Sequence, residues 1–274
     1  MPESVAAQIA VDANSGLVSD SGETASRPGV VELQAKGLCY RELNDRLREL
    51  AQQGVEDVVL RGVMGQRYLG TNLQRPMKVT VHGIPGNDLG AFMDGPTIEV
   101  LGSAQDGCGN TMNSGKIVVH GSAGDILGHS MRGGSIFVRD DVGYRVGIHM
   151  KEYGAVRPVI VIGGTAQHFL GEYMSGGVLI VLASRLGLGE CHPTRYVGTG
   201  MHGGVIYMRG QVDRTYLGKE VGQVSLAAED EWLLQRHVRE YAQYFHANAE
   251  RLLGASFVKL VPLTKRPYGQ LYAY

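Results

Sequence analysis

The sequence of 274 residues has few cysteines, few aromatic residues and almost no net charge. Its three cysteines, Cys39, Cys108 and Cys191, form no CxxC motif, and their odd, sparse number favours a reducing compartment. A formal charge of -1 argues against nucleic acid or an anionic membrane as the main partner. No apolar run reaches the ~18 residues of a spanning helix, and residues 1–7 do not begin a signal peptide. We therefore expect a cytoplasmic protein with no membrane partner.

Glycine, in contrast, is abundant at 40 residues, roughly twice its ordinary share of ~7%. The excess lies in an internal repeat of 19 residues, marked by Gly90, Gly109, Gly128 and Gly147 and by Met93, Met112, Met131 and Met150. The repeat continues with insertions to Gly171 and Met174 and to Gly198 and Met201, and a weaker first copy holds Gly65 and Gly70. The sequence thus contains about seven repeat units.

The repeat predicts an all-β core, a right-handed parallel β-helix of about seven turns with flanking capping helices. Each unit, with two short strands and glycine turns, is too small to bury a core alone, so successive units must stack at about 4.8 Å. Alternation in three strands points one set inward: Ile98, Val100, Ile117, Val119, Ile136 and Val138. The glycines are expected at corners that need a positive φ, and the methionines in an inward stack. A cofactor box is the less favoured interpretation of the methionines.

We divide the chain into four parts. Residues 1–28 are predicted to be a flexible tail, and residues 29–57 an N-terminal capping region with an amphipathic helix from Tyr40 to Gly54. Residues 58–210 are the β-helix, and residues 211–274 a long helix, Ala228 to Leu253, followed by an extended tail. Two insertions, 151–158 and 185–197, are expected to be surface loops and candidate partner contacts, with Lys151, Glu152, Tyr153, Arg157, Arg185, Glu190, His192 and Arg195.

Phosphate and metal chemistry find little support in the sequence. The glycine turns, such as 163–167, lead into strands, whereas a phosphate loop leads into a helix N-terminus. His82 and His120 share a register but are two units apart, roughly 9.6 Å, which is too far to share one metal. Five further histidines are interpreted as scattered surface or turn residues: His129, His149, His168, His192 and His202.

A nucleophile is equally hard to assign. Cys108 occupies a position that other repeats fill with Leu89, Leu127 or Val146, so it is expected to pack in the core, and a packing role is also expected for Cys39. Cys191 beside His192 leaves an active thiol open as an alternative. We predict no catalytic, cofactor-binding or metal-binding residue in this chain.

Six stretches resemble the GXGXG β-helix family: Val63–Gly70, Gly147–Tyr153, Pro158–Gly164, Phe169–Gly177, Gly198–Gly204 and Lys265–Gly269. This domain closes the large subunit of glutamate synthase and also forms the β-helical subunit of formylmethanofuran dehydrogenase. The resemblance covers roughly residues 30–274. It is strongest to the stand-alone counterpart of the domain in modular glutamate synthases.

The resemblance implies a non-catalytic structural subunit of an oxidoreductase complex that transfers the amide of glutamine and forms glutamate or N-methylglutamate. Its expected partners are glutaminase-like and FMN/iron–sulfur synthase subunits, and FMN and the iron–sulfur cluster are expected in those partners, not in this chain. The alternative is the β-helical subunit of a formylmethanofuran dehydrogenase or formyltransferase/hydrolase complex. An independent hydrolase using Cys191 and His192 is a third hypothesis.

Overall fold

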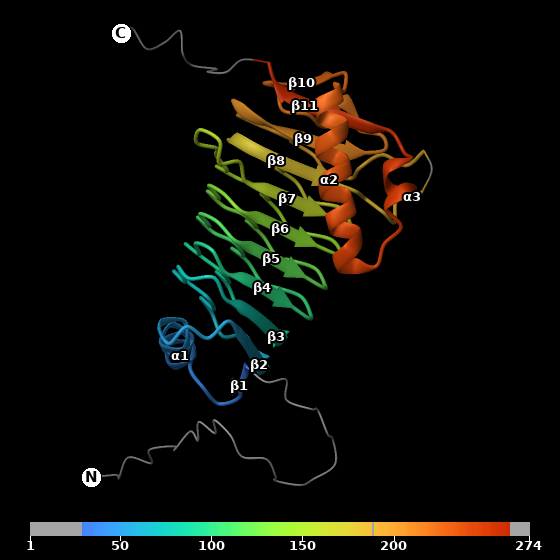
Figure 1. Ribbon diagram of the computed structural model, residues 1–274. Helices are drawn as coiled ribbons and strands as arrows, with labels where there is room; N and C mark the ends of the chain where they lie inside the picture. Colours follow the sequence, from blue (N-terminus) through green and yellow to red (C-terminus); the bar gives the residue numbers. More distant parts are fainter. Residues whose placement is uncertain (1–28, 188, 264–274) are drawn as a thin grey trace, which may run out of the picture.

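A computed structural model describes residues 29–187 and 189–263, so the two predicted tails, 1–28 and 264–274, lie outside the described residues. The chain coils upward from β1 to β9 and ends in two further strands (Figure 1). The strands are β1 (Val30–Gln34), β2 (Asp57–Met64), β3 (Lys78–Ile84), β4 (Thr97–Val100), β5 (Lys116–Val119), β6 (Ser135–Val138), β7 (Val159–Ile162), β8 (Ser175–Val181), β9 (Gly203–Arg209), β10 (Val221–Val224) and β11 (Phe257–Pro262). The helices are α1 (Tyr40–Gln52), η1 (Arg214–Tyr216), α2 (Ala228–Phe245) and α3 (Ala249–Leu253).

The predicted parallel β-helix is confirmed, with about six turns where the sequence indicated seven. Strands β1 to β9 pair in parallel with their successors, and β11 and β10 then extend the sheet in antiparallel. The prediction of a second strand in each unit is wrong. The opposite wall forms single bridges from one coil to the next, such as Ala104 with Ala123.

The interior of the coil is a column of apolar side chains. Ile98, Ile117 and Ile136 lie in register on β4, β5 and β6, so each branched side chain packs on its copy one turn later. The predicted methionine stack is confirmed, since all six members have no exposed surface: Met93, Met112, Met131, Met150, Met174 and Met201. Cys108 is also fully buried, as expected for a packing position.

Helix α1 closes the first coil, as its apolar stripe predicted. Leu43 and Leu47 are fully buried in the same core as the strands. Asn44 ties the helix to the first turn, because its side-chain Oδ1 accepts a hydrogen bond from the Gly70 N–H at 3.1 Å. Cys39 lies at the start of the helix and is exposed, so the packing role predicted for it is wrong. Its backbone N–H donates to the Glu42 carboxylate, and this contact holds the residue in place.

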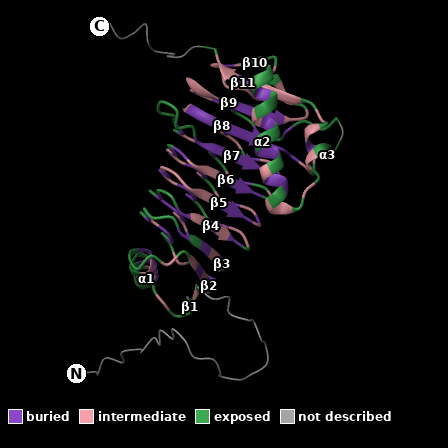
Figure 2. Cartoon of the chain, viewed as in Figure 1, coloured by how far each residue is buried: buried purple, intermediate pink, exposed green. Residues whose placement is uncertain are grey.

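Helix α2 covers the outer face of the upper sheet. Leu234, Val238 and Tyr241 pack on strand residues such as Phe137 and Ile180, which makes a second core outside the coil (Figure 2). The single helix predicted to Leu253 is wrong, because His246 adopts a left-handed conformation with φ 52° and ends α2. The chain then turns into α3. Within residues 29–187 and 189–263, no helix is both long and apolar enough to cross a membrane.

Candidate functional site: the ridge of left-handed turns

Each coil closes through a six-residue turn, whose residues we number 1 to 6. In the turn from Arg145 to Met150, positions 1, 3 and 5 have φ values of 56°, 71° and 55°. The side chains at positions 2 and 6, Val146 and Met150, are fully buried. Positive and negative φ values thus alternate along the turn, and this alternation directs positions 1 and 5 outward while positions 2 and 6 point into the core.

Seven of these six-residue turns bound the roughly six coils, and position 3 is glycine in all of them: Gly70, Gly90, Gly109, Gly128, Gly147, Gly171 and Gly198. Its positive φ favours glycine, and the interior requires it. A Cβ on Gly109 would lie 2.3 Å from Cδ1 of Ile136, and one on Gly128 at the same distance from Cδ1 of Ile160. The core side chain therefore fills the space that any larger residue would need.

Positions 1 and 5 have the same left-handed backbone but are mostly not glycine. Position 1 holds Tyr68, Asp88, Gly107, Ile126, Arg145, Phe169 and Tyr196, and position 5 holds Asn72, Phe92, Thr111, Ser130, His149, Tyr173 and Gly200. A non-glycine residue in this region costs about 1–2 kcal/mol. Such strain is typical of functional positions. Sequence reasoning missed these columns because their residue type varies from turn to turn.

Aromatic and basic side chains gather on the upper turns and form what we call the aromatic ridge. It comprises the side chains at positions 1 and 5 of three turns and those of the residue directly before each turn; position 5 of the third turn is Gly200, so eight side chains form the ridge: Tyr144, Arg145, His149, His168, Phe169, Tyr173, Arg195 and Tyr196. The rings of Phe169 and Tyr196 stack at 4.8 Å and 14°, and those of His149 and Tyr173 at 5.4 Å and 11°. The ridge is thus an ordered layer of rings, held one above another by the spacing of the coils.

The exposed charged groups of the ridge are the guanidinium groups of Arg145 and Arg195. Arg145 lies 4.8 Å above the Phe169 ring and binds the Glu172 carboxylate at 2.8 Å. The Arg145 side chain is 47% exposed and that of Glu172 only 10%, so the carboxylate lies beneath the guanidinium. Arg195 lies 4.9 Å above the ring of Tyr216. A partner that meets this surface therefore encounters positive charge and aromatic rings.

The structure brings together two histidines that the sequence left scattered. His129 and His149, on neighbouring coils, approach edge to face at 6.0 Å. Burial, and then the nearby His149, hold the pKa of His129 below its ordinary value. His168 joins the same surface, with its ring 5.6 Å from that of Tyr144. His129 thus lies beside the ridge, one coil closer to the N-terminus.

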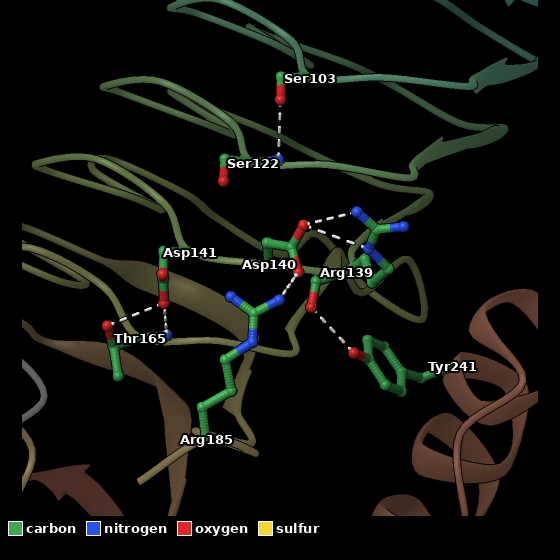
Figure 3. Close-up of polar contacts among 8 residues, drawn as sticks. All are labelled: Ser103, Ser122, Arg139, Asp140, Asp141, Thr165, Arg185 and Tyr241. Carbon is green, nitrogen blue, oxygen red and sulfur yellow. Dashed lines mark hydrogen bonds and ion pairs between the residues drawn. The ribbon is translucent and has the colours of Figure 1, made fainter.

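A polar cluster on another edge of the coil fastens the second insertion to the body (Figure 3). Asp140 accepts hydrogen bonds from the guanidinium groups of Arg139 and Arg185, and the bond from Arg139 holds the Asp140 pKa below its usual value. The hydroxyl of Tyr241 on α2 donates to the carbonyl of Arg139 at 3.0 Å, while burial raises the Tyr241 pKa to about 12. Each of these groups has a partner, so we interpret the cluster as an anchor for the loop and for α2.

A related row of side chains links the coils along this edge. The hydroxyl of Ser103 accepts from the Ser122 N–H at 3.2 Å, and the Asp141 carboxylate accepts from the Thr165 N–H at 2.6 Å (Figure 3). Each side chain thus binds a backbone group one coil further along. The row stabilises the stacking of coils in the same way as side chains that cap a turn.

The structure does not bring Cys191 and His192 together as a catalytic pair. His192 is buried, and its Nε2 donates to the carbonyl of Arg209 at 2.8 Å. Cys191 is exposed, and its Sγ approaches Gln211 at 3.9 Å. His192 therefore does not serve as the base that would be needed to activate the Cys191 thiol.

The other candidates lie in structural contacts. His120 binds Glu99 at 2.9 Å and packs on the ring of Phe245 at 5.2 Å, and this contact helps to dock the end of α2. In the first insertion, Glu152 pairs with Arg157 at 3.2 Å and accepts from the Gly177 N–H. Across the part of the chain that the structure describes, no three His, Cys, Asp or Glu side chains are grouped so as to hold a metal ion.

A model described as the GXGXG motif matches residues 55–263. The chain belongs to the GXGXG family. The alternate glycines of this motif have the spacing of positions 1, 3 and 5, the three left-handed residues of each turn. This chain has glycine at position 3 of every turn, but among positions 1 and 5 it has glycine only at Gly107 and Gly200.

This GXGXG chain is similar to two known proteins. It is 48% identical over 251 residues to uncharacterized protein MJ1350 of Methanocaldococcus jannaschii. The aligned region covers 88% of this chain and 96% of that protein. It also resembles a chain in the crystal structure of the formyltransferase/hydrolase complex FhcABCD from Methylorubrum extorquens in complex with methylofuran. That match has a TM-score of 0.55 and 19% identity over 73% of this chain and 71% of the other, so the likeness is one of fold.

Proposed function

We propose that this chain is a scaffold subunit of a multisubunit enzyme complex, in which the β-helix braces partner chains that carry the active sites. The observation that carries this proposal is the arrangement of the exposed aromatic and charged side chains. In residues 29–187 and 189–263, the aromatic and charged side chains run in rows along the coil edges, as in the ridge. Such rows suit a long contact with a protein, whereas small-molecule sites are concave.

The fold comparison supports an assembly of the formyltransferase/hydrolase type. A chain of similar fold is part of the FhcABCD complex, and the likeness extends over about three quarters of each chain. In this proposal the chain would take the place of that β-helical subunit, and formyltransferase and hydrolase subunits would be its partners. The fold match makes this the first assembly to test.

A glutamate-synthase-type assembly is the second candidate, and the six sequence stretches given above favour it. Three of them, Gly147–Tyr153, Phe169–Gly177 and Gly198–Gly204, contribute to successive turns of the ridge. In this candidate the partners would be glutaminase-like and FMN/iron–sulfur subunits, and the product would be glutamate or N-methylglutamate. This chain would supply no cofactor residues to either reaction.

The test is a native purification of the tagged chain from its source cells, with the same tag on an unrelated protein as the control. Mass spectrometry identifies the co-purifying subunits, and native mass measurement gives their ratio to the tagged chain. Formyltransferase and hydrolase subunits would support the first assembly. A glutaminase-like subunit with flavin and iron–sulfur absorbance would support the second. A chain that purifies alone, at low and at moderate salt, would overturn the scaffold role.

A further inference from the structure

We propose that the aromatic ridge is the surface through which this chain docks a partner subunit, and that the partner presents carboxylates to Arg145 and Arg195. The inference rests on the proposed scaffold function and names the surface that serves it. Aromatic residues and arginine dominate the energetic centres of protein interfaces. The ridge concentrates both types on three neighbouring turns.

Backbone strain is the first observation behind this inference. Phe169, Tyr173 and Tyr196 have φ values of 65°, 51° and 60°, although the turn accepts glycine at equivalent positions, as Gly107 and Gly200 demonstrate. The fold alone would be more stable with glycine there, because the left-handed region costs a side chain about 1–2 kcal/mol. Residues that the fold itself disfavours point to a use on the surface.

Preorganisation is the second observation. The Tyr173 ring lies against Gly200 of the next turn, where a Cβ would come within 2.4 Å of Tyr173 Cδ1. Phe169 and Tyr196 stack on each other, yet Tyr173 and Tyr196 remain 47% and 52% exposed. Large exposed rings that are already held in place lose little side-chain entropy on binding. The ridge thus has the properties of a binding surface before any partner arrives.

The distribution of charged side chains along the solenoid indicates which chemical groups the partner presents. Along the same edge, the two turns directly below the ridge place Asp106 and Asp125 on the surface directly before position 1, and the ridge turns place Tyr144 and Arg195 at that point. Glu172, beneath the ridge, is 7% exposed and is covered by Arg145, while the carboxylates of Asp125 and Glu220 accept hydrogen bonds from the backbone N–H groups of Tyr144 and Gly200. A carboxylate-bearing protein segment complements the ridge turns and is repelled by the two turns directly below them, which limits its extension along the solenoid in that direction.

Glycine variants separate docking from folding. Tyr196→Gly and Tyr173→Gly remove a ridge side chain and relieve the left-handed strain, so the chain should stay folded. We expect the concentration at which half of the tagged chain is assembled, measured by mass photometry on the purified native complex, to rise about tenfold or more. Phe92→Gly is the matched control, because Phe92 has the same left-handed backbone, with φ 57°, and is 50% exposed but lies at position 5 of a lower turn outside the ridge. Folded glycine variants that assemble like the wild type would overturn the docking surface and leave the scaffold role standing.

A second experiment tests the partner's chemistry in the same native complex. The Arg195→Lys variant keeps the charge and adds an amine that carbodiimide joins to a neighbouring carboxylate as an amide, with loss of water. We expect mass spectrometry to find residue 195 joined to an Asp or Glu of another chain. Cross-links only to this chain's own Glu172 or Glu220, or nucleic acid in the complex, would overturn the inference. A chain that purifies alone would overturn both proposals.

Discussion

At the scale of single residues, the turn places its strictest demand on position 3. Gly109 has a φ of +71°, and its Cβ would lie 2.3 Å from Ile136 Cδ1. Gly109→Ala combines a left-handed backbone cost with overpacking, so we expect the free energy of unfolding to fall by about 3 kcal/mol. Gly154→Ala, at φ +57° with nothing within 4 Å, should lose only about 1 kcal/mol. Urea unfolding of the two variants gives the comparison.

A double-mutant cycle shows whether the clash is the cause. Ile136→Val removes the Cδ1 atom that occupies the space, at its own cost of about 0.5–1.5 kcal/mol. In the double variant with Gly109→Ala, we expect a favourable coupling of about 1 kcal/mol. Strictly additive losses would mean that the turn, and not the packed isoleucine, excludes a side chain from position 3.

His192 predicts a pH dependence of stability. Burial holds its pKa below the ordinary value, and within the described residues its Nδ1 has no hydrogen-bond partner, so a proton there would be buried without an acceptor. The unfolded chain binds this proton more readily than the folded one. The contribution of His192 is therefore fully present above about pH 6.5 and is lost as the pH falls below it.

The measurement is urea unfolding at pH 7.5 and pH 5.5. His192→Gln should reduce the loss of stability between these two values, because its neutral amide does not titrate and keeps a donor for the Arg209 carbonyl. His82→Gln, on the half-buried surface of β3, is the control. The same loss in wild type and in the His192 variant would show that other groups carry the pH dependence.

At the scale of the elements, the strands and their order were predictable, because Gly and Met recur at a fixed step and mark each coil. The interior columns followed from simple alternation in β4, β5 and β6. The left-handed residues at positions 1 and 5 were not predictable, since Ile126, Arg145 and Phe169 have no conformational preference in common. Their backbone is imposed by the stacked turns above and below. The ridge, made of those residues, was hidden for the same reason.

The end of α2 is an element boundary that the sequence also concealed. Residues on both sides of His246 continue the apolar stripe, yet His246 adopts φ 52° and its N–H bonds to the Ala242 carbonyl. His246 is exposed, so its side chain contributes little packing. We expect His246→Gly to stabilise the chain by about 0.5–1 kcal/mol, because glycine is the preferred residue at a left-handed helix end. His246→Ala should destabilise it, and thermal unfolding of both variants would contradict the assignment if the order were reversed.

At the scale of the whole molecule, the two ends of the solenoid are covered differently. On β7 every residue is buried, because the coil fills one face and α2 the other, whereas β3 buries only alternate residues (Figure 2). In a solenoid each coil contacts only its neighbours, so local stability follows local burial. We expect native-state hydrogen exchange to be slowest in β6 to β8 and faster in β2 to β4.

The same reasoning predicts how a defect spreads. Leu47→Ala creates a cavity under α1, at a cost of about 2–5 kcal/mol, and should accelerate exchange in β1 to β3 while β7 and β8 keep their rates. Val238→Ala on α2 is the matched variant at the other end and should produce the opposite pattern. Mass spectrometry of exchanged peptides resolves the two regions. Uniform acceleration in both variants would mean that the coils unfold as one cooperative unit, and then the covered upper half could not hold the ridge in place while the lower coils open.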